Sequence, residues 1–116
     1  MKVLKFGGTS VGTAERMKKL IPVISDNFPC IVVLSAMSGT TDKLSKLSSY
    51  LYEQDNSNAS RLINAMQEQY SEVVAGLYSD EAIIKKALDM LNSHFDYLRT
   101  FTMDMFSQNI GRTISR

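Results

Sequence analysis

Two short apolar runs near the N-terminus predict β-strands. The first contains Val3, Leu4 and Phe6 and is broken by two adjacent glycines, and the second is the unbroken, largely β-branched run 30–34. Because the apolar residues are nearly continuous, we expect both faces of these strands to be covered, as in a parallel sheet.

Apolar residues recur at helical spacing between the two strands. A helix is predicted over about 14–27, with Thr13 as its N-terminal cap. Pro22 lies inside this pattern and is expected to kink the helix or split off its last turn. Strand, helix and strand form a βαβ unit, which predicts a right-handed crossover and parallel strands.

The remainder of the chain is predicted to be helical. One helix starts near Thr41, the stretch 55–58 is a polar break, and a second helix covers 59–76 and ends at Gly76.

A third helix is predicted from about 80 to 107, with Ser79 as its capping hydroxyl. This helix is long for a globular protein, so a break near His94 is expected. The tail, residues 109–116, shows no clear periodicity.

Composition narrows the classes of function. The 116 residues suffice for one small domain, and a net charge of +1 argues against nucleic-acid binding. No apolar run approaches the roughly 20 residues that a membrane helix needs. The single cysteine, Cys30, excludes an internal disulfide and fits a reducing compartment. We therefore expect a cytoplasmic protein without a nucleic-acid or membrane partner.

Two loops rich in glycine and hydroxyl side chains directly follow the predicted strands. The first comes after Lys5 and Phe6 and covers 7–12, and the second covers 35–42. Ligands of parallel sheets bind outside the carboxyl ends of the strands, so both loops should face one crevice. Backbone N–H groups near glycines, helix N-termini and a lysine charge all favour anions. These features together predict a site for a phosphate-containing ligand.

Two common phosphate motifs do not fit the first loop. Gly7 and Gly12 have the P-loop spacing, but Thr13 follows where that motif has a lysine. The dinucleotide fingerprint fails because the first two glycines are adjacent. The lysine of this loop lies before the glycines instead of after them.

The segment 5–11, Lys-Phe-Gly-Gly-Thr-Ser-Val, resembles the opening signature of aspartate kinases, in the amino-acid kinase superfamily. The segment 33–42 resembles the second loop of that family, at the expected spacing. Acetylglutamate and uridylate kinases keep the lysine and the paired glycines but generally lack the Thr-Ser-Val continuation. The segment 95–99 resembles the monofunctional branch, and the resemblance covers about residues 1–107.

The resemblance implies an α/β fold of the amino-acid kinase (carbamate-kinase-like) type. Such a domain has three αβα layers around a parallel-type sheet, and this segment would be its mostly helical part. Residues 1–116 would form an incomplete N-terminal part of one domain, with the regulatory domains absent. Because two strands leave exposed edges, pairing with another chain and hence a homo-oligomer are expected.

Aspartate kinases transfer the γ-phosphoryl group of ATP to the side-chain carboxylate of L-aspartate, giving 4-phospho-L-aspartate. This is the first step of lysine, threonine and methionine biosynthesis. The carboxylate is already ionised at neutral pH, so catalysis reduces to alignment and charge stabilisation. ATP and Mg²⁺ would enter as the substrate complex, without a prosthetic group or a protein metal site.

The resemblance also implies roles for individual residues. The residues implied in ATP-phosphate binding are Lys5, Gly7, Gly8, Thr9, Ser10 and Ser35. Lys5 would be catalytic, since it would neutralise charge on the transferring phosphoryl group. Thr41 would contact the aspartate substrate, with Gly39 keeping that loop close. Thr41 also suits a helix cap.

The chain departs from the family in its length and in its tail. Aspartate kinases are several times longer and continue with a Gly-Glu segment, further substrate-binding residues and the adenine-binding half. Residues 110–116 differ from the strand expected before that segment. We therefore expect negligible kinase activity from these residues alone. The alternatives are another amino-acid kinase and a non-catalytic anion-binding or helical interaction module based on 59–107.

Overall fold

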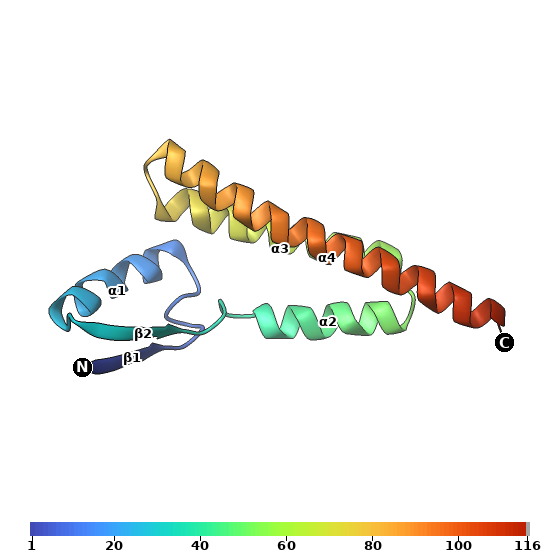
Figure 1. Cartoon of the computed structure of the whole chain (residues 1–116), viewed down its shortest axis with the longest axis horizontal. Helices are drawn as coiled ribbons and strands as arrows, with labels where there is room; N and C mark the ends of the chain where they lie inside the picture. The colour runs from blue at the N-terminus through green and yellow to red at the C-terminus, as the bar shows by residue number, and fades with distance from the viewer. Residues whose placement is uncertain (116) are drawn as a thin grey trace.

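In a computed structural model, the chain forms an elongated arrangement of strands and helices (Figure 1). The backbone is described for residues 1–115 and the side chains for residues 1–107. The elements are β1 (Lys2–Phe6), α1 (Ala14–Asp26), β2 (Cys30–Leu34), α2 (Thr40–Tyr52), α3 (Asn56–Leu77) and α4 (Glu81–Ser115). The radius of gyration is 17.9 Å, whereas a compact domain of this length has about 13 Å.

The predicted parallel sheet is confirmed. β1 and β2 pair in parallel, with Lys2 opposite Cys30 and Phe6 opposite Leu34. Since the strands run in register, they end at the same edge of the sheet, and the loops that follow them leave from that edge.

Helix α1 connects the two strands and is capped as predicted. The Thr13 Oγ1 accepts a hydrogen bond from the Arg16 N–H at 3.1 Å. The helix continues past Pro22 to Asp26, so of the two effects predicted for Pro22 the splitting off of the last turn is wrong.

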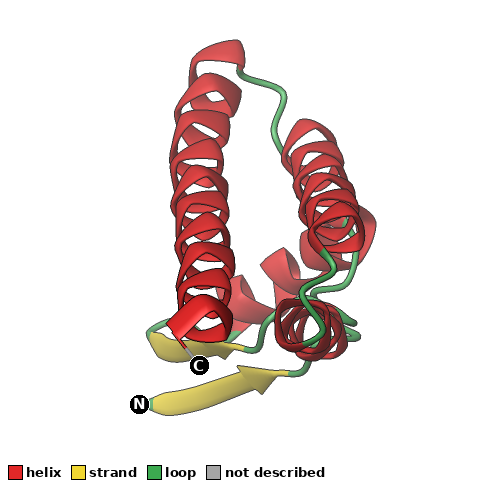
Figure 2. Ribbon diagram, turned by 90° about the vertical axis from the view of Figure 1, so that its right-hand side faces the viewer, coloured by secondary structure: helices red, strands yellow, loops and turns green. Residues whose placement is uncertain are grey.

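The sheet is partly covered on one face and open on the other. Leu4 and Val32 are partly buried on the side of α1, although Leu34 at the end of that face is 58% exposed. On the opposite face, Val3, Ile31 and Val33 are 63%, 51% and 43% exposed. The expectation that both faces are covered is therefore wrong for the described residues. The physical reason is that α2 extends away from the strands, and α3 and α4 lie on one side of them (Figure 2).

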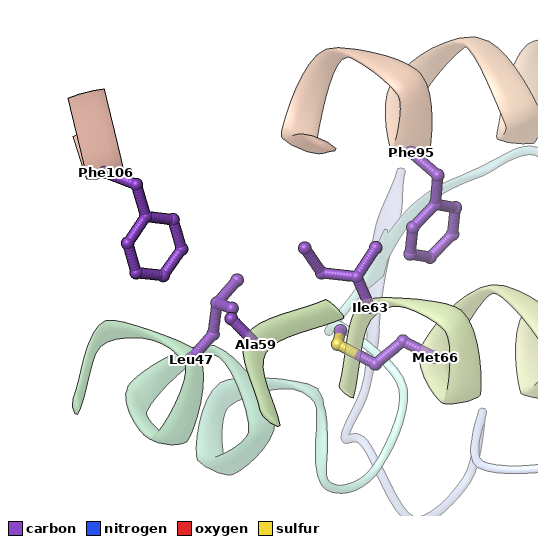
Figure 3. Close-up of a cluster of buried hydrophobic side chains, with 6 residues drawn as sticks. All are labelled: Leu47, Ala59, Ile63, Met66, Phe95 and Phe106. Atoms are coloured by element: carbon purple, nitrogen blue, oxygen red, sulfur yellow. The ribbon is translucent and has the colours of Figure 1, made fainter. Parts of the chain in front are cut away.

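The hydrophobic core lies among α2, α3 and α4 instead of on the sheet. Its buried members are Leu47, Ala59, Ile63, Met66, Phe95 and Phe106, which come from all three helices (Figure 3). The helical part of the chain therefore has a core of its own, and this core holds α2 in place.

Helix α3 starts earlier than predicted and does not end at Gly76. The Asp55 carboxylate caps it by accepting from the Asn58 N–H at 3.1 Å. A Cβ added to Gly76 would lie 3.1 Å from the Ala14 Cβ. Gly76 therefore lets α3 approach the start of α1, and the helix continues to Leu77.

Helix α4 is longer than predicted and has a different cap. The Asp80 carboxylate, not Ser79, accepts from the Ala82 N–H at 2.8 Å. The helix passes His94 without the predicted break and continues to Ser115. Within the described residues, none of the helices combines the length and apolar character needed to cross a membrane.

Candidate functional site

The two loops of the candidate site are bonded to each other at the end of the sheet. We define loop 1 as residues 7–13 and loop 2 as residues 35–39. The Ser35 N–H donates to the Phe6 carbonyl at 3.0 Å, and the Ser38 N–H donates to the Gly8 carbonyl at 3.1 Å. The prediction that both loops leave one edge of the sheet is confirmed.

The paired glycines of loop 1 have different surroundings. A Cβ added to Gly8 would lie 3.0 Å from the Ala36 carbonyl oxygen and 3.3 Å from the Ser38 nitrogen. Both atoms belong to the backbone, which cannot yield as a flexible side chain does. A Cβ at Gly7 would meet no atom within 4 Å. Gly8 is therefore needed for the contact between the loops, whereas Gly7 leaves the loop backbone uncovered.

This difference predicts unequal effects of two matched substitutions. Gly8→Ala is expected to lower the free energy of unfolding by about 1–3 kcal/mol, because the added methyl group pushes the loops apart. Gly7→Ala, the control, should change it by no more than about 0.5 kcal/mol. Urea denaturation followed by circular dichroism measures both values. Equal values for the two variants would contradict the role given to Gly8.

Arg16 of α1 stabilises loop 1 and was not predicted from the sequence. Its Nη1 donates to the Thr9 carbonyl at 3.0 Å. Inside the loop, the Ser10 N–H donates to the Gly7 carbonyl at 3.1 Å. Thr9, Ser10, Arg16 and Lys19 line an open depression of about 280 Å³. Two cationic side chains of α1 thus lie beside the predicted phosphate loop.

Each polar loop is anchored by one buried apolar residue that the sequence interpretation missed. Val11 of loop 1 and Met37 of loop 2 are both buried. They line an apolar pocket of about 480 Å³ together with residues of α1 and the end of α3. The sequence feature that could have indicated this burial is the single large apolar residue within each run of small polar residues.

Lys5 and Ser35 lie at the ends of the two strands. Lys5 pairs with Val33 in the sheet register and lies on the uncovered face with Val3. Among the described residues, the Lys5 ammonium has neither an ion pair nor a hydrogen bond. Ser35 is exposed immediately after β2. Both polar groups are therefore accessible from solvent at the edge where the loops begin.

Gly39, not Thr41, is the N-terminal cap of α2. It has a φ of +84°, a left-handed conformation that favours glycine, and it makes no side-chain capping bond. The predicted capping role of Thr41 is therefore wrong. Thr41 lies exposed in the first turn of the helix, directly beside loop 2.

The edge of the sheet thus collects groups that favour anions. Loop 1 leads into the N-terminus of α1 and loop 2 into the N-terminus of α2, and Lys5 lies before the first of them. Helix N-termini and exposed backbone N–H groups suit phosphate oxygens, and a lysine adds a full positive charge.

Comparisons with known proteins identify relatives for most of the chain. The sequence profile of the amino acid kinase family matches residues 1–109. An aspartokinase of Rickettsia prowazekii is 52% identical over 46 residues, 36% of this chain and 10% of that protein. An aspartokinase of Pseudomonas aeruginosa is 33% identical over 104 residues, 86% of this chain and 24% of that protein.

A plant protein gives a similar match. The chloroplastic bifunctional aspartokinase/homoserine dehydrogenase 1 of Arabidopsis thaliana is 34% identical over 99 residues, 84% of this chain and 11% of that protein. The chain therefore spans between about a tenth and a quarter of the length of these relatives.

Proposed function

Since the chain belongs to the amino acid kinase family, we propose that it is the N-terminal part of the catalytic domain of an aspartate kinase. The aspartokinase relatives bear out the resemblance predicted from the sequence. The observation that carries the proposal is the direct bonding of loop 1 to loop 2, through the Ser38 N–H and the Gly8 carbonyl. Each of these loops resembles one signature of aspartate kinases, and together they occupy one edge of the sheet.

In the proposed reaction, the side-chain carboxylate of L-aspartate attacks the γ-phosphorus of ATP, which is bound as its Mg²⁺ complex. The bond from this phosphorus to the bridging oxygen breaks, giving 4-phospho-L-aspartate and ADP. The ionised carboxylate needs no general base, so the protein contributes alignment and positive charge. Lys5 would neutralise charge on the transferring group.

Loop 1 and the start of loop 2 would bind the phosphates, and the end of loop 2 with the first turn of α2 would bind the aspartate. Gly7 and Gly8 would offer backbone N–H groups to the phosphates, with Thr9, Ser10 and Ser35 nearby, and Gly39 and Thr41 would lie against the aspartate. The Thr-Ser-Val continuation at 9–11 and the exposed Thr41 favour aspartate over the acceptors of other amino-acid kinases. The product would enter the route to lysine, threonine and methionine, and the enzyme would be cytoplasmic and oligomeric.

The uncovered face of the sheet supports a larger domain. Val3, Ile31 and Val33 are apolar and exposed there, and further elements of a three-layer αβα domain would cover them. The proposed domain therefore continues beyond these residues. Residues 1–116 alone should have negligible kinase activity.

Binding of the ATP–Mg²⁺ complex tests the phosphate half of the site directly. We expect amide signals of Gly7–Ser10 and Ser35 to shift when the complex is titrated into the labelled chain. Lys5→Ala should weaken this binding roughly tenfold, since a hydrogen bond to a charged group contributes about 1.5–3 kcal/mol. Lys85→Ala, which removes an exposed lysine of α4, is the matched control. Equal affinities for the two variants would count against the proposal.

A further inference from the structure

Two adjacent side chains of α3 hold the first turn of α2. The Tyr70 hydroxyl is hydrogen-bonded to the Thr40 Oγ1, and the Lys43 Nζ donates to the Gln69 Oε1. Residues three apart lie on the same face of a helix, so both bonds act on one face of α2. The start of α2 is thus attached to α3 at two points.

These attachments replace the local cap that α2 lacks. Gly39 has no side chain, so it cannot accept from the free N–H groups at the start of the helix. The position of the first turn therefore depends on contacts with α3. Without the bonds from Tyr70 and Gln69, the backbone around Gly39 would be held mainly by the hydrogen bonds within its own turn.

Tyr70 is fixed from the other side by the hydrophobic core. Its ring packs on the ring of Phe95 of α4, with centroids 6.0 Å apart and a tilt of 60°. This is a favourable geometry for aromatic pairs. Phe95 is a buried member of the core and Tyr70 packs against that core. The hydroxyl of Tyr70 is therefore presented to α2 from a fixed position.

A chain of hydrogen bonds continues from Thr40 to the phosphate loop. The Thr40 N–H donates to the Met37 carbonyl at 3.1 Å, and the neighbouring Ser38 N–H donates to the Gly8 carbonyl at 3.1 Å. Thr41 is rotated by about 100° from Thr40 around the helix. It is exposed, so the contact with α3 leaves its side chain accessible to a substrate.

We propose that Tyr70 is a positioning residue that sets loop 2 and the first turn of α2 against loop 1. Through Thr40, its hydroxyl fixes where Thr41 stands relative to the phosphate loop, and hence where the carboxylate acceptor meets the phosphoryl group. The reference to an acceptor rests on the proposed function, whereas the attachment of loop 2 to α3 does not.

Tyr70→Phe tests this role, because it keeps the ring in the core and removes only the hydroxyl. Tyr97→Phe makes the same chemical change at an exposed position of α4 and is the matched control. The Thr40 N–H donates to the Met37 carbonyl and the Lys43 N–H to the Gly39 carbonyl. In the full chain without ligand, we expect Tyr70→Phe to raise the exchange rates of these two amides about fivefold. Exchange in the core of α3 should stay unchanged, which separates local positioning from general destabilisation.

Titration with the ATP–Mg²⁺ complex provides the second measurement. In the wild-type chain, the signal of Ser35 in loop 2 should shift together with those of loop 1, and Tyr70→Phe should at least halve the shift in loop 2 alone. Faster exchange throughout the chain, or no more change than in Tyr97→Phe, would overturn the positioning role. A wild-type chain whose loop 1 does not respond would contradict the proposed function instead, while the exchange rates still decide the role of Tyr70.

Discussion

Lys5→Ala is expected to lower the kcat of an aspartate kinase that carries this segment by about 10²–10³-fold, the usual effect of removing one preorganised charge-stabilising group. A suitable enzyme is a chimera in which residues 1–107 replace the aligned segment of the Pseudomonas aeruginosa aspartokinase, which is 33% identical over 104 residues. Lys5 is exposed at the edge of the sheet where the loops begin. Aspartate-dependent release of ADP in a coupled assay measures the effect.

Two further variants make this result specific. Lys85→Ala removes an exposed lysine of α4 and should leave kcat unchanged. Lys5→Arg keeps the positive charge but changes its shape and reach, so it should restore only part of the turnover. A correctly folded Lys5→Ala chimera with the turnover of the unmodified chimera would contradict the catalytic role.

Ile63→Ala is expected to lower the free energy of unfolding by about 2–4 kcal/mol, the range for truncating a fully buried aliphatic side chain. Ile63 is 1% exposed and lies in the core among α2, α3 and α4 (Figure 3). The loss combines the transfer of the removed methyl groups with the cavity that remains. Urea denaturation followed by circular dichroism gives the value.

Ile83→Ala is the matched control, since it makes the same change at a side chain of α4 that is 46% exposed. Its effect should be no more than about 0.5 kcal/mol. Equal losses for the two variants would show that the helical core is not where the stability of this chain resides.

Local patterns in the sequence were sufficient to predict β1, β2 and the cap of α1. Continuous β-branched residues indicate strands, and the Thr13 cap depends only on the next three residues. The strand–helix–strand order then dictates parallel pairing and a common edge for both loops. The lysine and glycines of loop 1 were recognised for the same reason, because their pattern is short and contiguous.

The features that the sequence interpretation missed depend on contacts between distant segments. Gly76 has the pattern of a helix terminator, but its actual role is the close approach of α3 to Ala14. Arg16 and Tyr70 are unremarkable in the sequence, and only the fold brings them to Thr9 and Thr40. The uncovered face of the sheet could not be predicted from strand composition, which is the same whether or not other elements cover it.

We propose that loops 1 and 2 form the phosphate and acceptor side of an aspartate kinase site. The most direct test is the rate of ADP release by the chimera with L-aspartate, compared with the unmodified Pseudomonas aeruginosa enzyme. Since a misplacement of about 1 Å costs roughly 10²-fold in rate, a correctly aligned segment should keep the rate within about tenfold. A folded chimera of the same oligomeric size that releases no ADP with aspartate would contradict this assignment of the two loops.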